Sequence, residues 1–208
     1  MKLLLTFLMA VLASAPGLMA QSQVNYSAAP GQPAVYNIDG SALANGNAVW
    51  IGTFDATFNV TAFANQPQQL LAHWHPFGQN VVTTIGGQPG RFSGSSSSTD
   101  PFFGNQKIYL WIFSTDSAAA PATNNFGNVN EYGLYSCSTN SNWAFSPDPP
   151  PSNLRTINSG HVNDLLFGSR DLTHLYLSPG FIVVPEPSTV ALLSIAIPAA
   201  LLALRRRR

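Results

Sequence analysis

The sequence predicts a mainly β chain: a single sandwich-like or distorted-barrel domain with one short helix, flanked by an N-terminal signal peptide and a C-terminal transmembrane helix. Short apolar runs alternate with turn-forming clusters of Gly, Pro, Asn and Ser. Two strongly apolar stretches lie at the two ends, and every aromatic residue except Phe7 lies between them. We therefore expect residues 21–183 to form one β-rich extracytoplasmic domain, preceded by residues 1–20 and followed by residues 184–208.

The central segment contains several runs with strand character. In chain order they are Ala34–Ile38, Ala48–Phe54, Val81–Ile85, Arg91–Ser96, Lys107–Ser114, Glu131–Cys137, Trp143–Ser146 and Leu172–Leu177. The run from Lys107 to Phe113 is almost entirely apolar or aromatic, which predicts a central strand buried on both faces. We expect Phe54, Phe58 and Phe63 to form a smaller satellite cluster.

One helix is predicted over Pro67–Trp74. Asn65 is the expected N-cap, Pro67 suits the first turn, and Leu70 and Trp74 share one face. The polar stretch Ser93–Asp100 is consistent with a polar strand or a flexible tip, and Asn158–Phe167 is interpreted as loop.

The N-terminal segment, 1–20, has the order of a secretory signal peptide. Lys2 precedes an apolar run over Leu3–Ala13, and Pro16-Gly17 and small residues follow it. The run is too short for an ordinary membrane span. We predict cleavage after Ala20. Cleavage after Ala13-Ser14-Ala15, which would place Pro16 just after the cut, and an uncleaved N-terminal anchor are the alternatives.

The C-terminal segment, 184–208, combines three features in a fixed order. Pro185-Glu186-Pro187 precedes the apolar segment Ser188–Leu204, which is about 25 Å long as a helix and so just spans a bilayer. Basic residues follow directly, and the positive-inside rule places them in the cytoplasm. These membrane-stop arginines are Arg205, Arg206, Arg207 and Arg208.

This arrangement resembles the PEP-CTERM protein-sorting domain found on secreted proteins of exopolysaccharide-producing Gram-negative bacteria. This C-terminal segment carries the resemblance, which implies that a membrane-embedded exosortase cleaves near Pro185-Glu186-Pro187. The body segments GTFDATFNV, GRFSGS, KIYLWIF and EYGLYS are also similar to bodies of other PEP-CTERM proteins, a similarity that names no activity. It also implies later release or transfer to the envelope or matrix. Because Pro185 and Pro187 favour extended backbone, they suit a protease substrate, and Glu186 would be a recognition charge.

The neutral formal charge of the chain hides an acidic centre. The segment 21–184 contains four basic and eight acidic residues, whereas the four final arginines and Lys2 belong to the ends. This distribution excludes the basic footprint of a nucleic-acid-binding protein. About a third of the same residues are Asn, Ser, Thr or Gln, which suits a hydrated polysaccharide matrix.

His73 and His75 form the one close histidine pair, and Cys137 is the single cysteine. On a strand the two histidines would share a face and could bind a metal, whereas on the predicted helix they would diverge. We interpret them as structural or surface histidines. Cys137 is interpreted as a buried, inert thiol; intermolecular pairing and a nucleophilic pair with His161 or His174 are the alternatives.

Acidic residues and tryptophans scattered along the chain are candidates for glycoside hydrolysis or sugar binding. Paired carboxylates for glycoside hydrolysis would have to come from acids such as Asp39, Asp55, Asp164 and Asp171. Exposed tryptophans could stack on sugar rings, but burial in the core is the stronger expectation; the candidates are Trp50, Trp74 and Trp143. We predict no catalytic residues, metal or cofactor.

The sequence thus favours a non-enzymatic secreted, surface or extracellular-matrix protein. Its expected partners are signal peptidase and the export machinery, the membrane before processing, an exosortase, and exopolysaccharide or biofilm material. The alternative is a secreted carbohydrate-binding module or hydrolase that uses the same sorting route.

Overall fold

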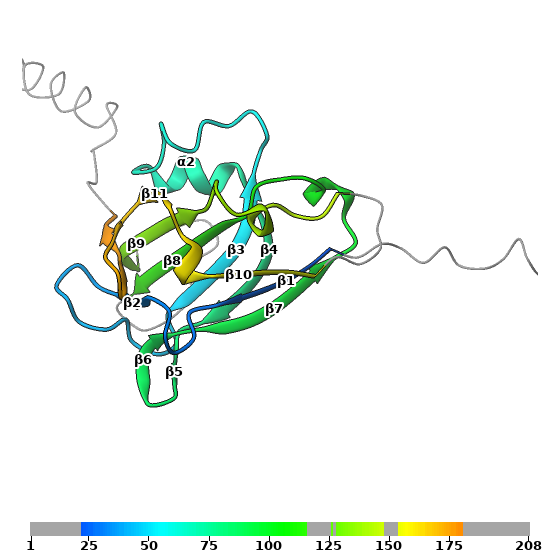
Figure 1. Ribbon diagram of the computed structural model, residues 1–208. Helices are drawn as coiled ribbons and strands as arrows, with labels where there is room; N and C mark the ends of the chain where they lie inside the picture. The colour runs from blue at the N-terminus through cyan, green and yellow to red at the C-terminus, as the bar shows by residue number, and fades with distance from the viewer. Residues whose placement is uncertain (1–21, 116–125, 127, 148–153, 181–208) are drawn as a thin grey trace, which may run out of the picture.

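The computed structural model describes residues 22–115, 126, 128–147 and 154–180 (Figure 1). This part of the chain is mainly β, and its single α-helix is α2, Pro67–Ala72. The longer strands are β1 (Ser22–Ser27), β3 (Ala48–Phe54), β4 (Trp74–Val81), β7 (Ser93–Ser98), β8 (Tyr109–Thr115), β9 (Val129–Ser136) and β10 (Leu154–Asn158). The shorter ones are β2 (Ala34–Tyr36), β5 (Thr83–Ile85), β6 (Gln88–Arg91), β11 (Asp164–Phe167), β12 (Ser169–Arg170), β13 (His174–Tyr176) and β14 (Ser178–Pro179).

The largest sheet has six strands. Its order is β11-β9-β8-β3-β4, and β14 also pairs with β9. All of these neighbours are antiparallel, with β8 in register between β3 and β9. The predicted strand over Ala48–Phe54 has the same bounds in the structure.

A three-stranded sheet, β10-β1-β7, lies on the side of the large sheet opposite α2 (Figure 1). In it β1 pairs parallel with β10 and antiparallel with β7. A second small sheet has the order β12-β13-β2, and β5 and β6 form a hairpin. None of these sheets closes on itself, so the expectation of a barrel is wrong.

Strand β8 has buried side chains on both faces, as predicted. Leu110 and Ile112 join the cluster shared with β1 and β10, where Val24, Tyr26 and Ile157 are also buried. Trp111 and Phe113 point to the other face, because side chains alternate along a strand, and join the cluster under α2. The large sheet is therefore covered on both sides.

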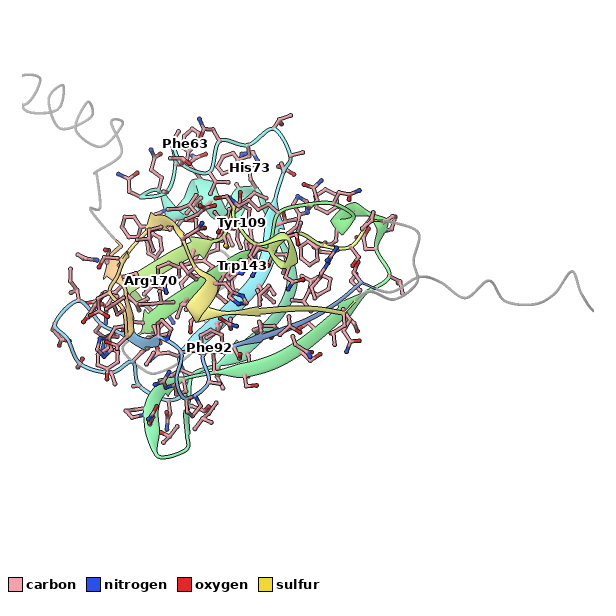
Figure 2. The ribbon with its side chains drawn as sticks, in the orientation of Figure 1. Phe63, His73, Phe92, Tyr109, Trp143 and Arg170 are labelled. Carbon is pink, nitrogen blue, oxygen red and sulfur yellow. The ribbon has the colours of Figure 1, made fainter. Side chains whose placement is uncertain are left out.

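The aromatic cluster predicted around Phe58 is present on the α2 side. Phe58 lies 5.8 Å from Phe54 and 5.3 Å from Phe63 between ring centroids. Leu70 of α2 is fully buried against the same face of the sheet. Figure 2 shows Phe63 and His73 on this side and Phe92 on the opposite side of the sheet.

The predicted helix is shorter than expected and lacks its predicted cap. It ends at Ala72, and Trp74 begins β4 rather than lying on the helix. The N-cap is Gln66, not Asn65, and it makes no side-chain capping bond. Pairing with β3 outweighs the helical pattern here, because Trp74 lies opposite Phe54 and buries its ring against it.

Other boundaries also differ from the prediction. The run Trp143–Ser146 is not a strand: Ser141–Trp143 is a 3₁₀ turn in which the Asn140 side chain accepts a bond from the Asn142 N–H. The polar run over Ser93–Ser98 is a strand, and Asn158–Phe167, expected to be loop, ends in β11. The strands β1 and β10 were not anticipated, because few of their side chains are apolar.

The predicted signal peptide and the segment 184–208 lie outside the described residues. Within the part of the chain that is described, no helix is long and apolar enough to cross a membrane.

Candidate functional site

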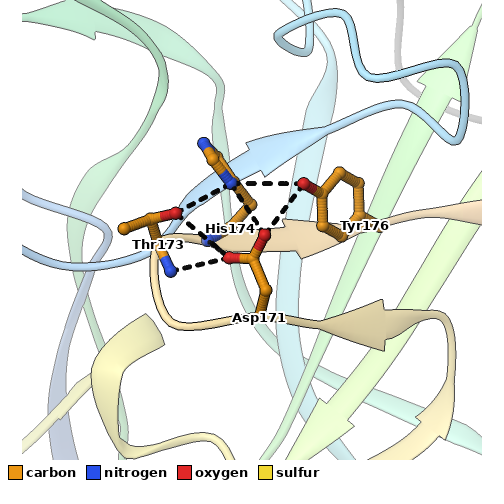
Figure 3. Close-up of polar contacts among 4 residues, drawn as sticks. All are labelled: Asp171, Thr173, His174 and Tyr176. Atoms are coloured by element: carbon orange, nitrogen blue, oxygen red, sulfur yellow. Dashed lines mark hydrogen bonds and ion pairs between the residues drawn. The ribbon is translucent and has the colours of Figure 1, made fainter.

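The turn between β12 and β13 is organised by the carboxylate of Asp171. One oxygen, Oδ1, accepts bonds from the backbone N–H groups of Thr173 and His174, both at 2.7 Å. The other, Oδ2, accepts from the Tyr176 hydroxyl at 3.0 Å and lies 3.1 Å from His174 Nδ1 (Figure 3). A short acidic side chain that bonds its own backbone two residues on is a common way to close a turn.

This bonding sets the electrostatics of the turn. The N–H of Thr173, followed by the His174 side chain, holds the pKa of Asp171 well below its ordinary value. The bond to the ionised Asp171 raises the pKa of Tyr176, because the hydroxyl must stay protonated to donate. Asp171 therefore orients His174 through Nδ1, and the other ring nitrogen faces away from the carboxylate (Figure 3).

The parallel pairing of β13 with β2 brings Tyr36 beside this turn. His174 is in register with Ala34, and its ring lies 4.2 Å from that of Tyr36 in an edge-on arrangement. Tyr36 thus contacts a residue from the far end of the described chain.

A polar pocket of about 420 Å³ opens between this turn and the β5–β6 hairpin. Its volume lies within the range of small-molecule sites. Its polar lining consists of Gln32, Tyr36, Gln88, Arg91, Thr173 and His174.

Arg91 is the one cation of this pocket that is always charged, and it is 8% exposed. Its Nη1 donates to the carbonyls of Ala29 and Gln32, and its Nη2 donates to Gln88 Oε1 at 2.6 Å. Its Nε is buried and has no hydrogen-bond partner among the described residues. Burial lowers the pKa of Arg91, whereas the neighbouring Tyr36 has the opposite, smaller effect.

The sequence-based search did not select Arg91, Tyr36 or Thr173. The Asp-x-Thr-His order at 171–174 was a signal for the turn, since an Asp two residues before a Thr favours this bonding. The contact of this turn with β2 and β6 depends on strand pairing between distant segments, which the order of residues does not reveal.

The His73–His75 pair has an acidic partner that is distant in sequence. Asp55 Oδ2 lies 2.7 Å from His73 Nδ1, and its Oδ1 lies 2.6 Å from His75 Nε2. These bonds, the one to His73 first, lower the pKa of Asp55. Phe58 stacks on His73 and Phe102 packs on His75. Each histidine takes a separate carboxylate oxygen, and no group of His, Cys, Asp or Glu among the described residues is arranged to hold a metal ion.

Cys137 is a buried free thiol, as predicted. It lines a pocket of about 480 Å³ together with His161, whereas His174 lies in the separate pocket beside Arg91. The thiol contacts Thr139 Oγ1 at 3.5 Å, and His161 Nε2 lies 3.3 Å from Asn158 Nδ2. The structure thus places Cys137 near one of its two candidate partners without a hydrogen bond between them in the described part.

Two of the three candidate tryptophans are buried. Trp143 is 1% exposed and Trp74 is 8% exposed. Trp50 is partly buried and, together with Trp74 and Leu71, lines an apolar groove of about 400 Å³ beside β4. Stacking of Trp143 on an external sugar is therefore excluded by its burial.

Each of the four candidate carboxylates bonds a different set of residues. Asp39 accepts bonds from Ser41, Asp55 binds the two histidines, Asp164 pairs with Lys107 at 2.5 Å, and Asp171 closes its turn. Partial burial acts to raise the pKa of Asp164, but the bonds from the lysine and from Ser138 together outweigh it and lower the pKa. The motif Pro185-Glu186-Pro187 and the terminal arginines lie outside the described residues.

The described residues define a mainly β protein with a polar pocket beside Arg91. Comparison of the chain with models of known protein families, with curated proteins and with solved structures finds no match.

Proposed function

We propose that this chain is an exported, non-enzymatic protein of the cell surface or extracellular matrix whose body is a β-sandwich. Signal peptidase would remove residues 1–20, and an exosortase would cleave near Pro185-Glu186-Pro187. Before that cleavage, Ser188–Leu204 would anchor the chain in the membrane with Arg205–Arg208 in the cytoplasm. The mature body would then associate with exopolysaccharide or biofilm material.

The observation that carries this proposal is the order of the three C-terminal features. A Pro-Glu-Pro motif, the apolar segment Ser188–Leu204 and four arginines follow one another without interruption. Each feature alone is common, but together they supply an extended cleavage segment, a span and a topology signal.

The body is compatible with loss of both ends. Its first strand begins at Ser22 and its last ends at Pro179, and every strand pairing among the described residues is made within these limits. The hydrophobic clusters likewise consist of residues between Val24 and Leu177. Cleavage at the proposed positions would therefore leave these contacts intact.

The test is a triple substitution of Pro185-Glu186-Pro187 by alanine, expressed in a strain that contains an exosortase. We expect an uncleaved form that stays in the membrane fraction. The matched control replaces Pro149, Pro150 and Pro151 by alanine, which changes a proline-rich segment elsewhere and should leave processing unchanged. Normal release of the first variant would refute the sorting proposal.

The alternative role of the body, as a carbohydrate-binding module, is favoured by the polar pocket beside Arg91. The separate engagement of the carboxylates favours binding over glycoside hydrolysis, which needs two carboxyl groups about 5–10 Å apart across one bond.

A further inference from the structure

We propose that the pocket between Arg91 and His174 binds the carboxylate of a small acidic ligand, such as a uronic acid. This deepens the binding role proposed for the body, although the pocket itself is independent of the export route. The proposal depends on the charge of Arg91, the donors around it and the size of the pocket.

The charge of Arg91 is buried without a carboxylate partner in the described part of the chain. The ion pairs there involve His73, His75, Lys107 and His174 instead. A buried charge that lacks a counter-ion is costly, and neutral carbonyl and amide oxygens offset only part of that cost. An anion in the pocket would supply the missing opposite charge.

The two glutamine side chains in the wall of the pocket offer donors to a ligand. Gln32 Oε1 is engaged by the Ser27 hydroxyl and the Ala29 N–H, and Gln88 Oε1 is engaged by Arg91. Since both amide oxygens are used within the protein, the NH₂ groups are the polar ends that remain for a ligand. Tyr36 also lines the pocket, and a tyrosine hydroxyl can donate a hydrogen bond.

Asp171, the acidic residue of the β12–β13 turn, does not line the pocket. The oxygens of Asp171 accept bonds from Thr173, His174 and Tyr176 within the β12–β13 turn. This bonding keeps Asp171 occupied and leaves the wall of the pocket without a carboxylate.

A monoanion fits this site better than a phosphate dianion. Arg91 supplies a single full positive charge, and the body as a whole is acidic. A volume of about 420 Å³ accommodates one small ring, and Leu172 and Pro89 supply apolar contacts for its remaining atoms. A free hydroxy acid and the uronate unit of an acidic glycan share this chemistry.

Isothermal titration of the full-length chain in detergent with D-glucuronate tests the proposal. We expect saturable binding of glucuronate and none of D-glucose, its neutral counterpart, at the same concentration. Tighter binding of a polyuronate than of the monosaccharide would identify a glycan as the source, and equal binding would identify the free acid. Equal binding of glucose, or binding of inorganic phosphate without glucuronate, would overturn the proposal.

Two variants locate the binding to this pocket. Arg91→Gln should weaken glucuronate binding at least about tenfold, as expected for loss of a charged hydrogen-bond partner. The matched control is Arg170→Gln, because Arg170 also donates to two backbone carbonyls, those of Val162 and Gly160, but does not line the pocket. Unchanged binding by Arg91→Gln would refute the site.

A second variant keeps the test decisive if Arg91→Gln fails to fold. Gln88 is exposed in the β5–β6 hairpin, and Gln88→Glu keeps the side-chain oxygen that accepts from Arg91 Nη2, so this variant should fold normally. It replaces the amide donor by a carboxylate beside Arg91 and should weaken glucuronate binding at least about tenfold. Wild-type affinity in a folded Gln88→Glu variant would contradict the proposed ligand contacts.

Discussion

The hydroxyl of Tyr135 donates a 2.6 Å hydrogen bond to the backbone carbonyl of Tyr176. Tyr135 lies in β9 of the six-stranded sheet, and Tyr176 lies in β13 of a small sheet, so this bond joins two sheets directly. The Tyr135 side chain is fully buried, and burial raises the pKa of its hydroxyl. Tyr176 in turn bonds Asp171, which connects the core to the turn beside the Arg91 pocket.

Tyr135→Phe should destabilise the fold by about 0.5–1.5 kcal/mol, because it removes the hydrogen bond between the Tyr135 hydroxyl and the Tyr176 carbonyl. Chemical denaturation of both proteins would measure the loss in free energy of unfolding. Tyr109→Phe is the matched control, since its hydroxyl makes no hydrogen bond to a described residue. Equal stability of Tyr135→Phe and wild type would show that the bond contributes nothing.

Gly52→Ala should destabilise the sheet by about 1–3 kcal/mol, the usual range for an overpacked core. A Cβ at this position of β3 would lie 2.3 Å from the His75 carbonyl oxygen and 2.7 Å from the Trp74 ring. The backbone of β4 would have to move, because the first contact is not with a flexible side chain. Thermal denaturation measures the effect; an unchanged midpoint would contradict the close approach of β3 and β4.

Asp171→Asn should change how stability depends on pH. The pKa of Asp171 is lower in the folded chain than its ordinary value of 3.8. Its ionised form therefore contributes stability that is fully present above about pH 5 and is lost as pH falls through the folded-state pKa. The variant should be less stable than wild type at pH 7, and the difference should shrink on acidification. A constant difference from pH 7 to pH 2 would contradict this linkage.

Much of the central sheet could be predicted from the sequence. β3 and β8 are runs of mostly apolar residues, and this composition alone predicts that they are buried strands. β7 reads SGSSSS and contains no apolar side chain, so its pairing with β1 is determined by a distant partner. The same holds for Trp74, which pairing with β3 removes from the predicted helix.

The candidate sites were predictable only in part. The His73–His75 pair is visible in the sequence. Asp55, which follows β3, bonds both histidines only because β3 pairs with β4. Arg91 is isolated in the sequence. Tyr36 and His174 share its pocket because β2 pairs with β13 and also contacts β6, the strand that contains Arg91. Spacing along the chain carries no information about such contacts.

The central claim is that an exosortase removes the C-terminal signal from an exported β body. Mass spectrometry of the mature protein's C-terminus, in a strain that contains the enzyme, tests it most directly. We predict a chain that ends beside Glu186 and has lost Ser188–Leu204 and the four arginines that follow. A mature chain that retains Arg205–Arg208 would contradict the claim.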